Sequence, residues 1–304
     1  MAGRSQFAIL DNRGLLRVAG EDSVQFLQGL VSNDIRNAGP ARAIYAALLT
    51  PQGKYLHDFF VLGLDGALLL DCERVRLDDL KKRLSMYKLR SKVTIEDVSD
   101  GYTVAALFGP DWRVGFGAGE AAGAAAPVGA GVVFVDPRLA EAGGRAVLPR
   151  GNAEAALVEA GLTKATAADY DRLRLRLGLP DGSRDLVVDK SILLESGFDE
   201  LNGVDWKKGC YMGQELTART KYRGLVKKRL VPVVLDGPPP EPGTPVTLSG
   251  REAGELRSAA ATENGGIGLA LLRLDSLAEA AKAGGAMRAG GVSITPAKAP
   301  WMAF

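Results

Sequence analysis

The chain has 304 residues, of which 46% are hydrophobic and 24% are charged, and its formal net charge is +2. A chain of this length and composition can bury substantial cores, so a disordered protein is excluded as the default and two or three domains are expected. The near-neutral charge argues against a dedicated DNA-binding protein, which usually carries a strongly basic face.

Cysteine usage and apolar runs indicate the compartment. Two cysteines provide no disulfide framework, which favours a reducing environment. Residues 1–7 lack a long apolar region, and Asp11 comes too early for a secretory signal. Asp65 interrupts the best apolar stretch, residues 59–70, which is shorter than the roughly 20 residues of a membrane-spanning helix. We expect a cytoplasmic protein, or a mitochondrial matrix protein in a eukaryote, with no membrane partner.

The first third of the chain alternates helical and extended patterns. Asp22 or Ser23 can cap a helix whose apolar face holds Val24, Leu27 and Val31. Residues 44–49 and 55–62 read as strands joined by a turn at 50–53. A second helix is expected where Leu77, Leu80, Leu84 and Tyr87 repeat at helical spacing. Residues 92–98 and 104–108 look extended, whereas the Ala/Gly-rich stretch 115–131 has little pattern.

Helices are expected over 152–161 and 166–177, the second ended by Gly178 and Pro180. Beyond residue 229 the apolar segments are short and separated by turns, and a Pro-rich connector occupies residues 237–243. These predicted strands are residues 230–235, 245–248, 255–261, 267–271 and 292–295. Their size and spacing suit a small β-barrel.

Residues 207–224, KKGCYMGQELTARTKYRG, form the most unusual segment. Cys210 lies between Gly209 and Gly213, after two lysines and before a predicted helix. Nearby ammonium groups or a helix N-terminus favour the thiolate, which attacks electrophiles and binds soft metals. The alternative is a buried structural cysteine in a Gly-flanked turn.

Charge is concentrated in the same region. Residues 207–229 contain eight basic side chains and one acid, Glu215. Such a patch suits an anionic ligand tail, an acidic partner or RNA, and it could also be a solvated helix end.

Other tempting signals are discounted. The glycines of 115–123 depart from the Gly-x-Gly-x-x-Gly spacing of a dinucleotide site. His57 is the only histidine, and no Gly-x-Ser-x-Gly elbow accompanies it. A zinc site or [4Fe–4S] cluster needs about four ligands, usually thiolate or imidazole, and Cys72, Cys210 and His57 are too few. A permanently bound metal or cluster in one monomer is therefore not expected, and Cys72, which lies beside acids, is expected to be inert.

The run Lys-Gly-Cys-Tyr-x-Gly-Gln-Glu at 208–215 resembles the signature of the YgfZ/Iba57 family, folate-binding-type factors of iron–sulfur cluster assembly related to the glycine-cleavage T-protein. Weaker family segments occur in the same order along nearly the whole chain. They are residues 20–34, 49–54, 177–180, 194–196 and 268–273.

The resemblance implies a T-protein-like (aminomethyltransferase) α+β fold, with mixed α/β N-terminal domains around a central cavity and a small C-terminal β-barrel. We expect a folate-binding-like region at 1–228 and the barrel at 229–304. The implied function is tetrahydrofolate-dependent assembly or repair of [4Fe–4S] clusters. The implied partners are iron–sulfur scaffold or carrier proteins and [4Fe–4S] client enzymes.

The resemblance also suggests roles for individual residues. Cys210 would be the redox or metal-contacting thiol, and Lys208 would stabilise its thiolate. Asp58 matches the place where T-proteins contact folate, and Glu195 is a second acidic candidate. The remaining candidates would orient the folate or contact a partner, and they are Gln214, Glu215, Arg219 and Arg223.

Two departures weaken the link to aminomethyl transfer. T-proteins often carry two adjacent Asp residues where this chain has His57-Asp58, and a pterin-binding Glu where it has Arg176. A guanidinium donates where a carboxylate accepts. Whether the protein turns over a substrate stays open, and a folate-dependent aminomethyl or one-carbon transferase is the main alternative. An RNA-modifying accessory protein is a third.

Overall fold

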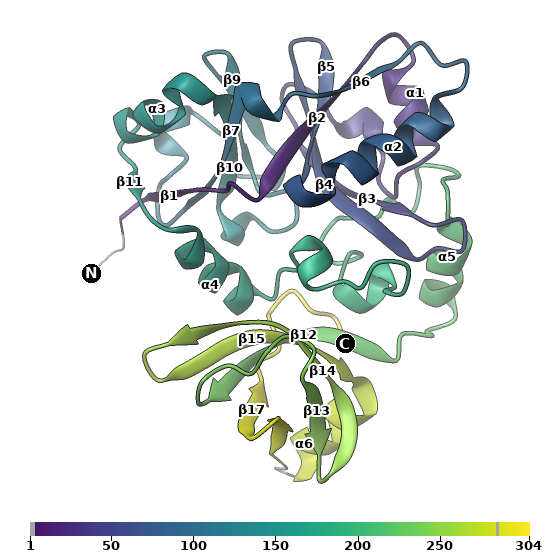
Figure 1. The fold of residues 1–304 in the computed structure, drawn as a ribbon, viewed down its shortest axis with the longest axis vertical. Coiled ribbons are helices and arrows are strands. Elements are labelled where there is room, and N and C mark those ends of the chain that lie inside the picture. Colours follow the sequence, from purple (N-terminus) through teal and green to yellow (C-terminus); the bar gives the residue numbers. More distant parts are fainter. Residues whose placement is uncertain (1–3, 284–285) are drawn as a thin grey trace. The chain divides into compact units, whose positions relative to one another are not determined.

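The computed structural model describes residues 4–283 and 286–304, which fall into two units assembled from discontinuous segments (Figure 1). Residues up to Leu49, Leu56–Tyr170 and Leu201–Met212 form the first unit. Thr50–Tyr55, Asp171–Glu200 and Gly213–Phe304 form the second. Residues 1–3, part of the N-terminal segment discussed above, lie outside the described residues.

Two antiparallel-rich sheets build the first unit. The first sheet has the order β11-β1-β7-β10-β9-β8 and the second has the order β3-β4-β5-β2-β6. The strands of the first are β11 (Thr163–Lys164), β1 (Gln6–Ile9), β7 (Tyr102–Phe108), β10 (Gly144–Pro149), β9 (Gly131–Val135) and β8 (Ala125–Val128). Those of the second are β3 (Ile44–Leu49), β4 (Tyr55–Leu64), β5 (Ala67–Glu73), β2 (Arg13–Ala19) and β6 (Thr94–Asp97).

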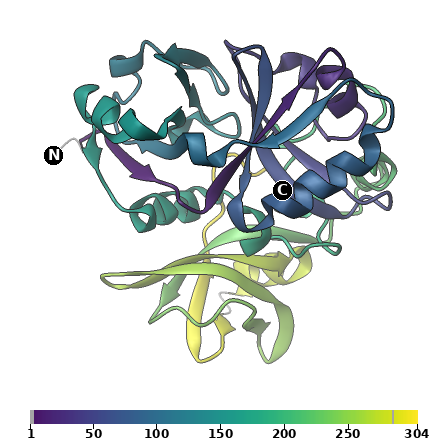
Figure 2. The same ribbon diagram turned by 45° about the horizontal axis from the view of Figure 1, so that its top comes forward.

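Three helices complete this unit. They are α1 (Ser23–Gln28), α2 (Leu77–Lys88) and α3 (Ala153–Glu159). Figure 2 shows α2 lying along the sheet that contains β2 and β6, where Leu77, Leu80 and Leu84 are buried. The predicted helix is thereby confirmed, but Tyr87, expected on the same apolar face, is 40% exposed.

A buried ionic cluster joins the two sheets. Asp71 on β5 accepts hydrogen bonds from Arg13 Nε at 2.6 Å and from Arg145 Nη1 at 3.1 Å, and all three side chains are at most 4% exposed. Arg145 also lies 4.2 Å from the ring centroid of Phe60. Because a buried charge is costly unless paired, Asp71 links β2 and β5 of one sheet to β10 of the other.

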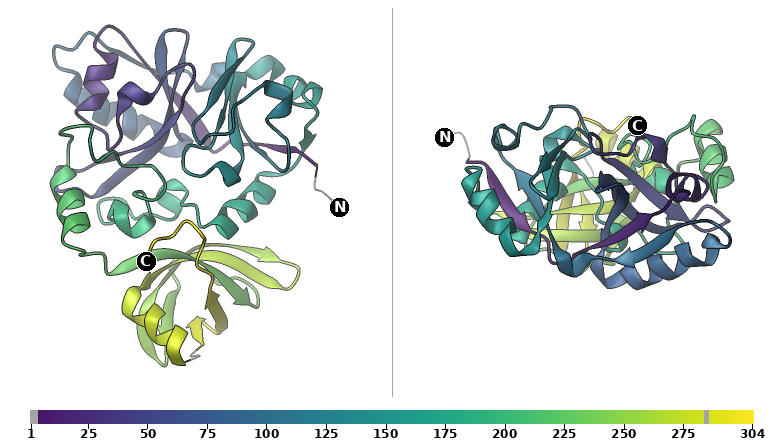
Figure 3. Two further views of the ribbon diagram at one scale, coloured as in Figure 1. Left: turned by 180° about the vertical axis from the view of Figure 1, so that it is seen from behind. Right: turned by 90° about the horizontal axis from the view of Figure 1, so that it is seen from above.

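The second unit is dominated by a closed barrel with the order β12-β15-β14-β13-β16-β17. Its strands are β12 (Lys228–Asp236), β15 (Gly265–Arg273), β14 (Arg251–Thr262), β13 (Pro245–Leu248), β16 (Met287–Ala289) and β17 (Val292–Pro296). The inward apolar residues form one cluster, and α6 (Leu274–Ala283), which follows β15 in the chain, packs on this cluster through Leu277 and Ala280 (Figure 3). The unit also holds α5 (Gln214–Tyr222), whereas α4 (Ala167–Leu177) begins in the first unit and continues into this one.

These elements confirm the expected α+β class and the small C-terminal barrel. The turn at 50–53 is also confirmed, since Gly53 has φ +80° and its N–H donates to Thr50 O at 2.8 Å. The helix begins directly after Asp22, as predicted, but the Asp22 carboxylate makes no capping hydrogen bond and accepts from Lys92 N instead. Val24, predicted to be apolar core, is exposed.

The expected boundary between residues 228 and 229 stays a prediction. The barrel's first strand begins at Lys228, and residues 50–55 and 171–200 group with the barrel unit. None of the helices in the described ranges has the length and apolar character needed to cross a membrane.

Candidate functional site: an exposed thiol beside a polar pocket

Cys210 lies in the first unit, on an irregular loop that precedes α5, and its side chain is exposed. The loop turns at Gly209, which has φ +93°, a conformation that residues with a Cβ rarely adopt. The alternative reading of Cys210 as a buried structural cysteine is therefore wrong. Solvent, a partner protein or a metal centre can reach this thiol.

Lys208 anchors residues 208–212, which we call the thiol loop, to the C-terminal end of α1. Its side chain is buried, and Nζ donates to the carbonyl of Gln28 at 2.8 Å and to the carbonyl of Val31. Gln28 Nε2 donates back to the carbonyl of Lys208 at 3.3 Å, and Met212 N donates to Gly29 O at 3.1 Å. Hydrogen bonds thus hold the loop on both sides of Cys210, at Lys208 and at Met212.

The same contacts define the chemistry of Lys208. Burial lowers the pKa of Lys208 to about 8, and Asp34 and Asp205 oppose this shift. Nζ also lies 5.1 Å from the centroid of the Tyr211 ring. The partners of Lys208 are therefore two carbonyls and an aromatic face, and its role as a thiolate stabiliser stays a prediction.

The segment before the loop is fixed to the same part of the chain. Ser32 Oγ donates to Gly203 O at 2.6 Å, and Asp205 N donates to Ser32 O at 3.0 Å. Asn33 Nδ2 donates to Asn202 O at 2.7 Å. Asn202 has φ +56°, a left-handed conformation that Asn tolerates better than most residues. Residues 202–208 therefore run alongside residues 28–33 as one hydrogen-bonded pair of segments.

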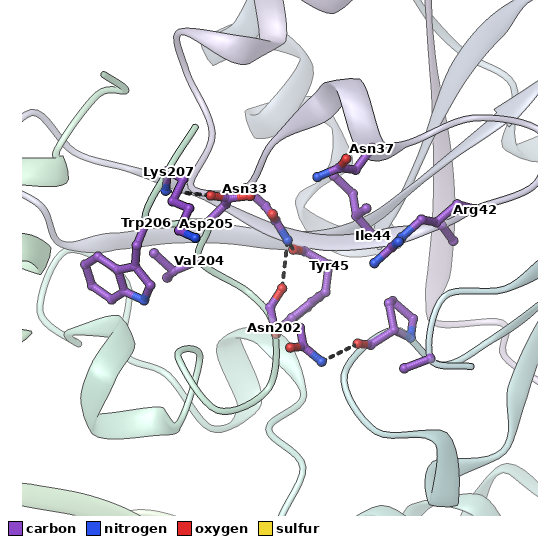
Figure 4. Close-up of a pocket in the computed structure, with 13 residues that line it drawn as sticks. Asn33, Asn37, Arg42, Ile44, Tyr45, Asn202, Val204, Asp205, Trp206 and Lys207 are labelled. Carbon is purple, nitrogen blue, oxygen red and sulfur yellow. Dashed lines mark hydrogen bonds between the residues drawn. The ribbon is translucent and has the colours of Figure 1, made fainter. Parts of the chain in front are cut away.

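A pocket of about 400 Å³ opens beside these paired segments (Figure 4). Its lining combines two aromatic side chains, three amides, two cations and one carboxylate. These are Tyr45, Trp206, Asn33, Asn37, Asn202, Arg42, Lys207 and Asp205. The volume suits a small ligand. Amides and aromatic faces suit a flat heterocycle, and the exposed Arg42 and Lys207 suit carboxylates attached to it.

Asp58 lies on β4 beneath this pocket's tyrosine. It is 5% exposed, and Tyr45 Oη donates to Asp58 Oδ2 at 2.7 Å. Burial and the Asp58 charge raise the pKa of Tyr45 well above its ordinary value, so the phenol keeps its proton. Tyr45 is fully buried, so its phenol and the Asp58 carboxylate belong to the wall of the pocket and are not open to a ligand.

His57, the neighbour of Asp58, faces a different partner. Its Nε2 lies 2.8 Å from Asp79 Oδ2, and burial lowers the pKa of His57 to about 4. The imidazole is therefore neutral at neutral pH, and it contacts α2 through Asp79.

The other predicted site residues belong to the second unit. Glu195 lies in the short 3-10 helix Leu193–Ser196. Burial raises the pKa of Glu195, and the charges of Lys228 and Lys54 oppose this shift. The remaining residues lie on or next to α5: Gln214 is half-buried, and Glu215, Arg219 and Arg223 are exposed. Sequence reasoning missed Asn202, Trp206 and Arg42. Only the long-range pairing of segments brings these three to one pocket.

Cys72 contrasts with Cys210 in every respect. It is 2% exposed on β5, and its Sγ donates to Gly14 O at 3.7 Å. Burial, rather than the neighbouring acids, is the main cause that raises the pKa of Cys72 to about 12. Within residues 4–283 and 286–304, no group of three His, Cys, Asp or Glu side chains is placed to hold a metal ion.

Substitution of Lys208 tests the anchoring of the loop. Lys208→Met leaves the carbonyls of Gln28 and Val31 without this donor, so we expect the free energy of unfolding to fall by about 1–3 kcal/mol. The exposed neighbour gives a matched control, and Lys207→Met should change it by less than about 0.5 kcal/mol. Urea unfolding measures both.

The cost of Lys208→Met should also depend on pH. The folded side chain releases its proton near pH 8, whereas the unfolded side chain holds it up to about 10.5. Since the unfolded chain binds more protons between these values, the wild type gains stability relative to the variant as pH rises through that window. Equal costs for both lysines at every pH would contradict the anchor.

Comparisons with known proteins agree with this arrangement. The family profile of the GCVT N-terminal domain matches residues 2–114, and that of the CAF17 C-terminal beta-barrel domain matches residues 227–304. Among solved structures, aminomethyltransferase T of the glycine cleavage system from Bartonella henselae superimposes with a TM-score of 0.77 at 15% identity, covering 99% of this chain and 87% of that one. This likeness confirms the T-protein-like fold.

Curated relatives are more similar in sequence. The mitochondrial iron–sulfur cluster assembly factor IBA57 of Mus musculus is 37% identical over 301 residues, which cover 88% of this chain and 77% of that protein. Its Homo sapiens counterpart is 38% identical over 284 residues, which cover 86% and 76%. Together with the barrel and GCVT-type domain matches, these identities show that the chain belongs to the IBA57 family of iron–sulfur cluster assembly factors.

Proposed function

We propose that this protein takes part in the assembly or repair of iron–sulfur clusters, including [4Fe–4S] clusters, and that Cys210 is the thiol that contacts the cluster or its carrier. The single observation that carries the proposal is an exposed Cys210 on a loop that buried Lys208 holds in place. The names of the IBA57 relatives support the pathway. The proposed location is the cytoplasm, or the mitochondrial matrix in a eukaryote.

One thiol sets the form that the chemistry takes. On binding iron, the Cys210 thiol loses its proton and its sulfur becomes one ligand of the cluster. A cluster needs about four thiolate-type ligands, and the second cysteine is buried. The other ligands therefore come from a scaffold or carrier protein or from the client enzyme, and the cluster is cargo that passes through a shared site.

A reduced folate is the second part of the proposal. The pocket beside the loop offers amide groups for the edge of a pterin ring, Trp206 for its face, and Arg42 and Lys207 for the glutamate carboxylates. Lys207 lines the pocket and Lys208 anchors the thiol loop. A ligand in the pocket would thus contact a residue next to the anchor of the thiol loop.

The T-protein-like fold also favours a second candidate, a folate-dependent aminomethyl or one-carbon transferase. Arg176, where T-proteins carry a pterin-binding Glu, lies on the exposed side of α4 and lines a separate pocket with Arg172. In this candidate the thiol has no role. Removal of the thiol therefore separates the two functions.

Rescue of a deletion strain tests the role of Cys210. Cells that lack the chain should lose most activity of [4Fe–4S] enzymes, and the wild-type chain should restore it. Cys210→Ala should fail to restore it because the sulfur ligand is gone. Cys72→Ser is the matched control and is expected to rescue if it folds, which circular dichroism verifies. Full rescue by Cys210→Ala would remove the thiol from the mechanism.

Calorimetry tests the folate. We expect tetrahydrofolate or 5-formyl-tetrahydrofolate to bind the wild type, and Arg42→Ala to weaken binding by roughly tenfold, the loss expected for one charge-assisted hydrogen bond. Asp58→Asn should also weaken it, because Tyr45 loses its charged acceptor. Arg90→Ala, an exposed arginine at the end of α2, is the control. Absence of binding heat with both folates would leave the pocket without this ligand.

A further inference from the structure

The C-terminal end of α5 exposes a group of side chains that neither the thiol nor the pocket uses. Tyr222 is 76% exposed and Leu225 is 47% exposed, although both are large and largely apolar. Arg219, Arg223 and Lys227 surround them in sequence and are exposed as well. We call these five residues the α5 surface.

The backbone under the α5 surface is rigid. Leu225 N donates to Thr220 O at 3.0 Å, and Gly224 N donates to Lys221 O at 3.2 Å. Gly224 has φ +60°, so the helix ends in a Schellman motif. The residue in the position of Leu225 often packs back on its own helix in this motif, whereas here nearly half of it faces solvent. Because hydrogen bonds already fix this backbone, binding through Leu225 orders little more than its side chain.

The electrostatics of this region are one-sided. Residues 216–235 contain six basic side chains and no acidic one, although the whole chain carries only +2. Lys221 pairs with Asp199 and Arg229 pairs with Glu200. Arg219 Nη1 lies 3.8 Å from Glu215 Oε1 at the start of the helix. Arg223 and Lys227, at its end, are exposed and keep that end of the α5 surface basic.

We propose that the α5 surface docks a partner protein whose face carries carboxylates around an apolar depression. Tyr and Arg contribute most of the binding energy in many protein interfaces, and an apolar centre with a charged rim is the usual arrangement. RNA is less well matched, because base stacking needs several aromatic faces and Tyr222 is the one aromatic residue of the five. The proposal rests on the proposed function in one respect: Cys210 lies four residues before the start of α5 in the chain, so this partner would be the protein that exchanges the cluster.

Site-specific photo-cross-linking in the full-length chain tests the docking. A benzophenone amino acid at position 225 should cross-link an acidic protein in cells, and the adduct should survive ribonuclease. Position 89 is the matched control, because Leu89 is 90% exposed and is flanked by Tyr87, Lys88 and Arg90 at the end of α2. An RNA adduct, or the same adduct from both positions, would overturn the proposal.

The cross-linked protein, once identified and purified, is titrated with defined variants. The double variant Arg219→Glu/Arg223→Glu should weaken its affinity by at least about tenfold, and rising salt should weaken the wild-type affinity. Lys88→Glu/Arg90→Glu, with the same charge change on α2, should leave it unchanged. Equal affinities of the two double variants would contradict the docking surface.

Rescue assays separate this inference from the role of the thiol. Cys210→Ala should keep the cross-link at position 225 and lose rescue, whereas Arg219→Glu/Arg223→Glu should lose both. Full rescue by the charge-reversed variant, with no rescue by Cys210→Ala, overturns the docking surface and leaves the thiol function intact. The opposite pattern, in which Cys210→Ala rescues and Arg219→Glu/Arg223→Glu does not, overturns the thiol function and leaves the docking surface intact.

Discussion

The buried ammonium of Lys208 binds the carbonyls of Gln28 and Val31, and the position of the thiol depends on this contact. A lysine in a buried position usually loses more by desolvation than it gains, and its lowered pKa shows that cost. This desolvation cost occurs at a short loop without regular structure, where the hydrogen bonds of Lys208 hold Cys210 in one place. Lys208 thus acts on the thiol through the backbone, whatever its electrostatic effect on the sulfur.

The two sheets of the first unit hold in place the segments that make this contact. The Asp71 cluster joins the two sheets, and the second sheet places Tyr45 and Asp58 under the pocket. The segments 28–33 and 202–208 then pair above them through Ser32 and Asn33. These paired segments therefore line the pocket at Asn33 and Asn202 and lead into the thiol loop at Lys208. This arrangement gives a ligand in the pocket a physical route to influence the thiol.

Sequence reasoning works where the pattern is local. The strands over 44–49 and 245–248 match β3 and β13 at both ends, since each is a short run that ends at turn residues; β3 is buried throughout, whereas burial alternates along β13. Sequence reasoning misses β8, whose Ala-Ala-Pro-Val gives almost no apolar period, and β9, whose short apolar run Gly-Val-Val-Phe-Val directly follows the Ala/Gly-rich stretch. Pairing of β9 with β10, residues Val132–Val135 against Gly144–Val147, supplies the missing information from elsewhere in the chain. The missing capping hydrogen bond at Asp22 has the same origin, a partner 70 residues away.

The candidate site divides in the same way. The motif at 208–215 and the family it resembles are readable from sequence, and so is the contrast between two cysteines. The partners of Lys208 lie 177 and 180 residues away, and those of Asn202 lie 65 and 169 residues away. Nothing in a local window indicates such contacts. Charge counting located the basic region, but only the structure separated the exposed Arg223 from the buried Arg229.

Alkylation of the native protein tests the central claim most directly. Folded protein is treated with iodoacetamide and digested, and mass spectrometry measures the modification of each cysteine. An exposed thiol on a fixed loop predicts rapid labelling of Cys210 in the folded state, with Cys72 labelled only after unfolding in urea. Labelling of Cys210 that also requires urea would show that the sulfur is inaccessible, and it would contradict every role proposed for it.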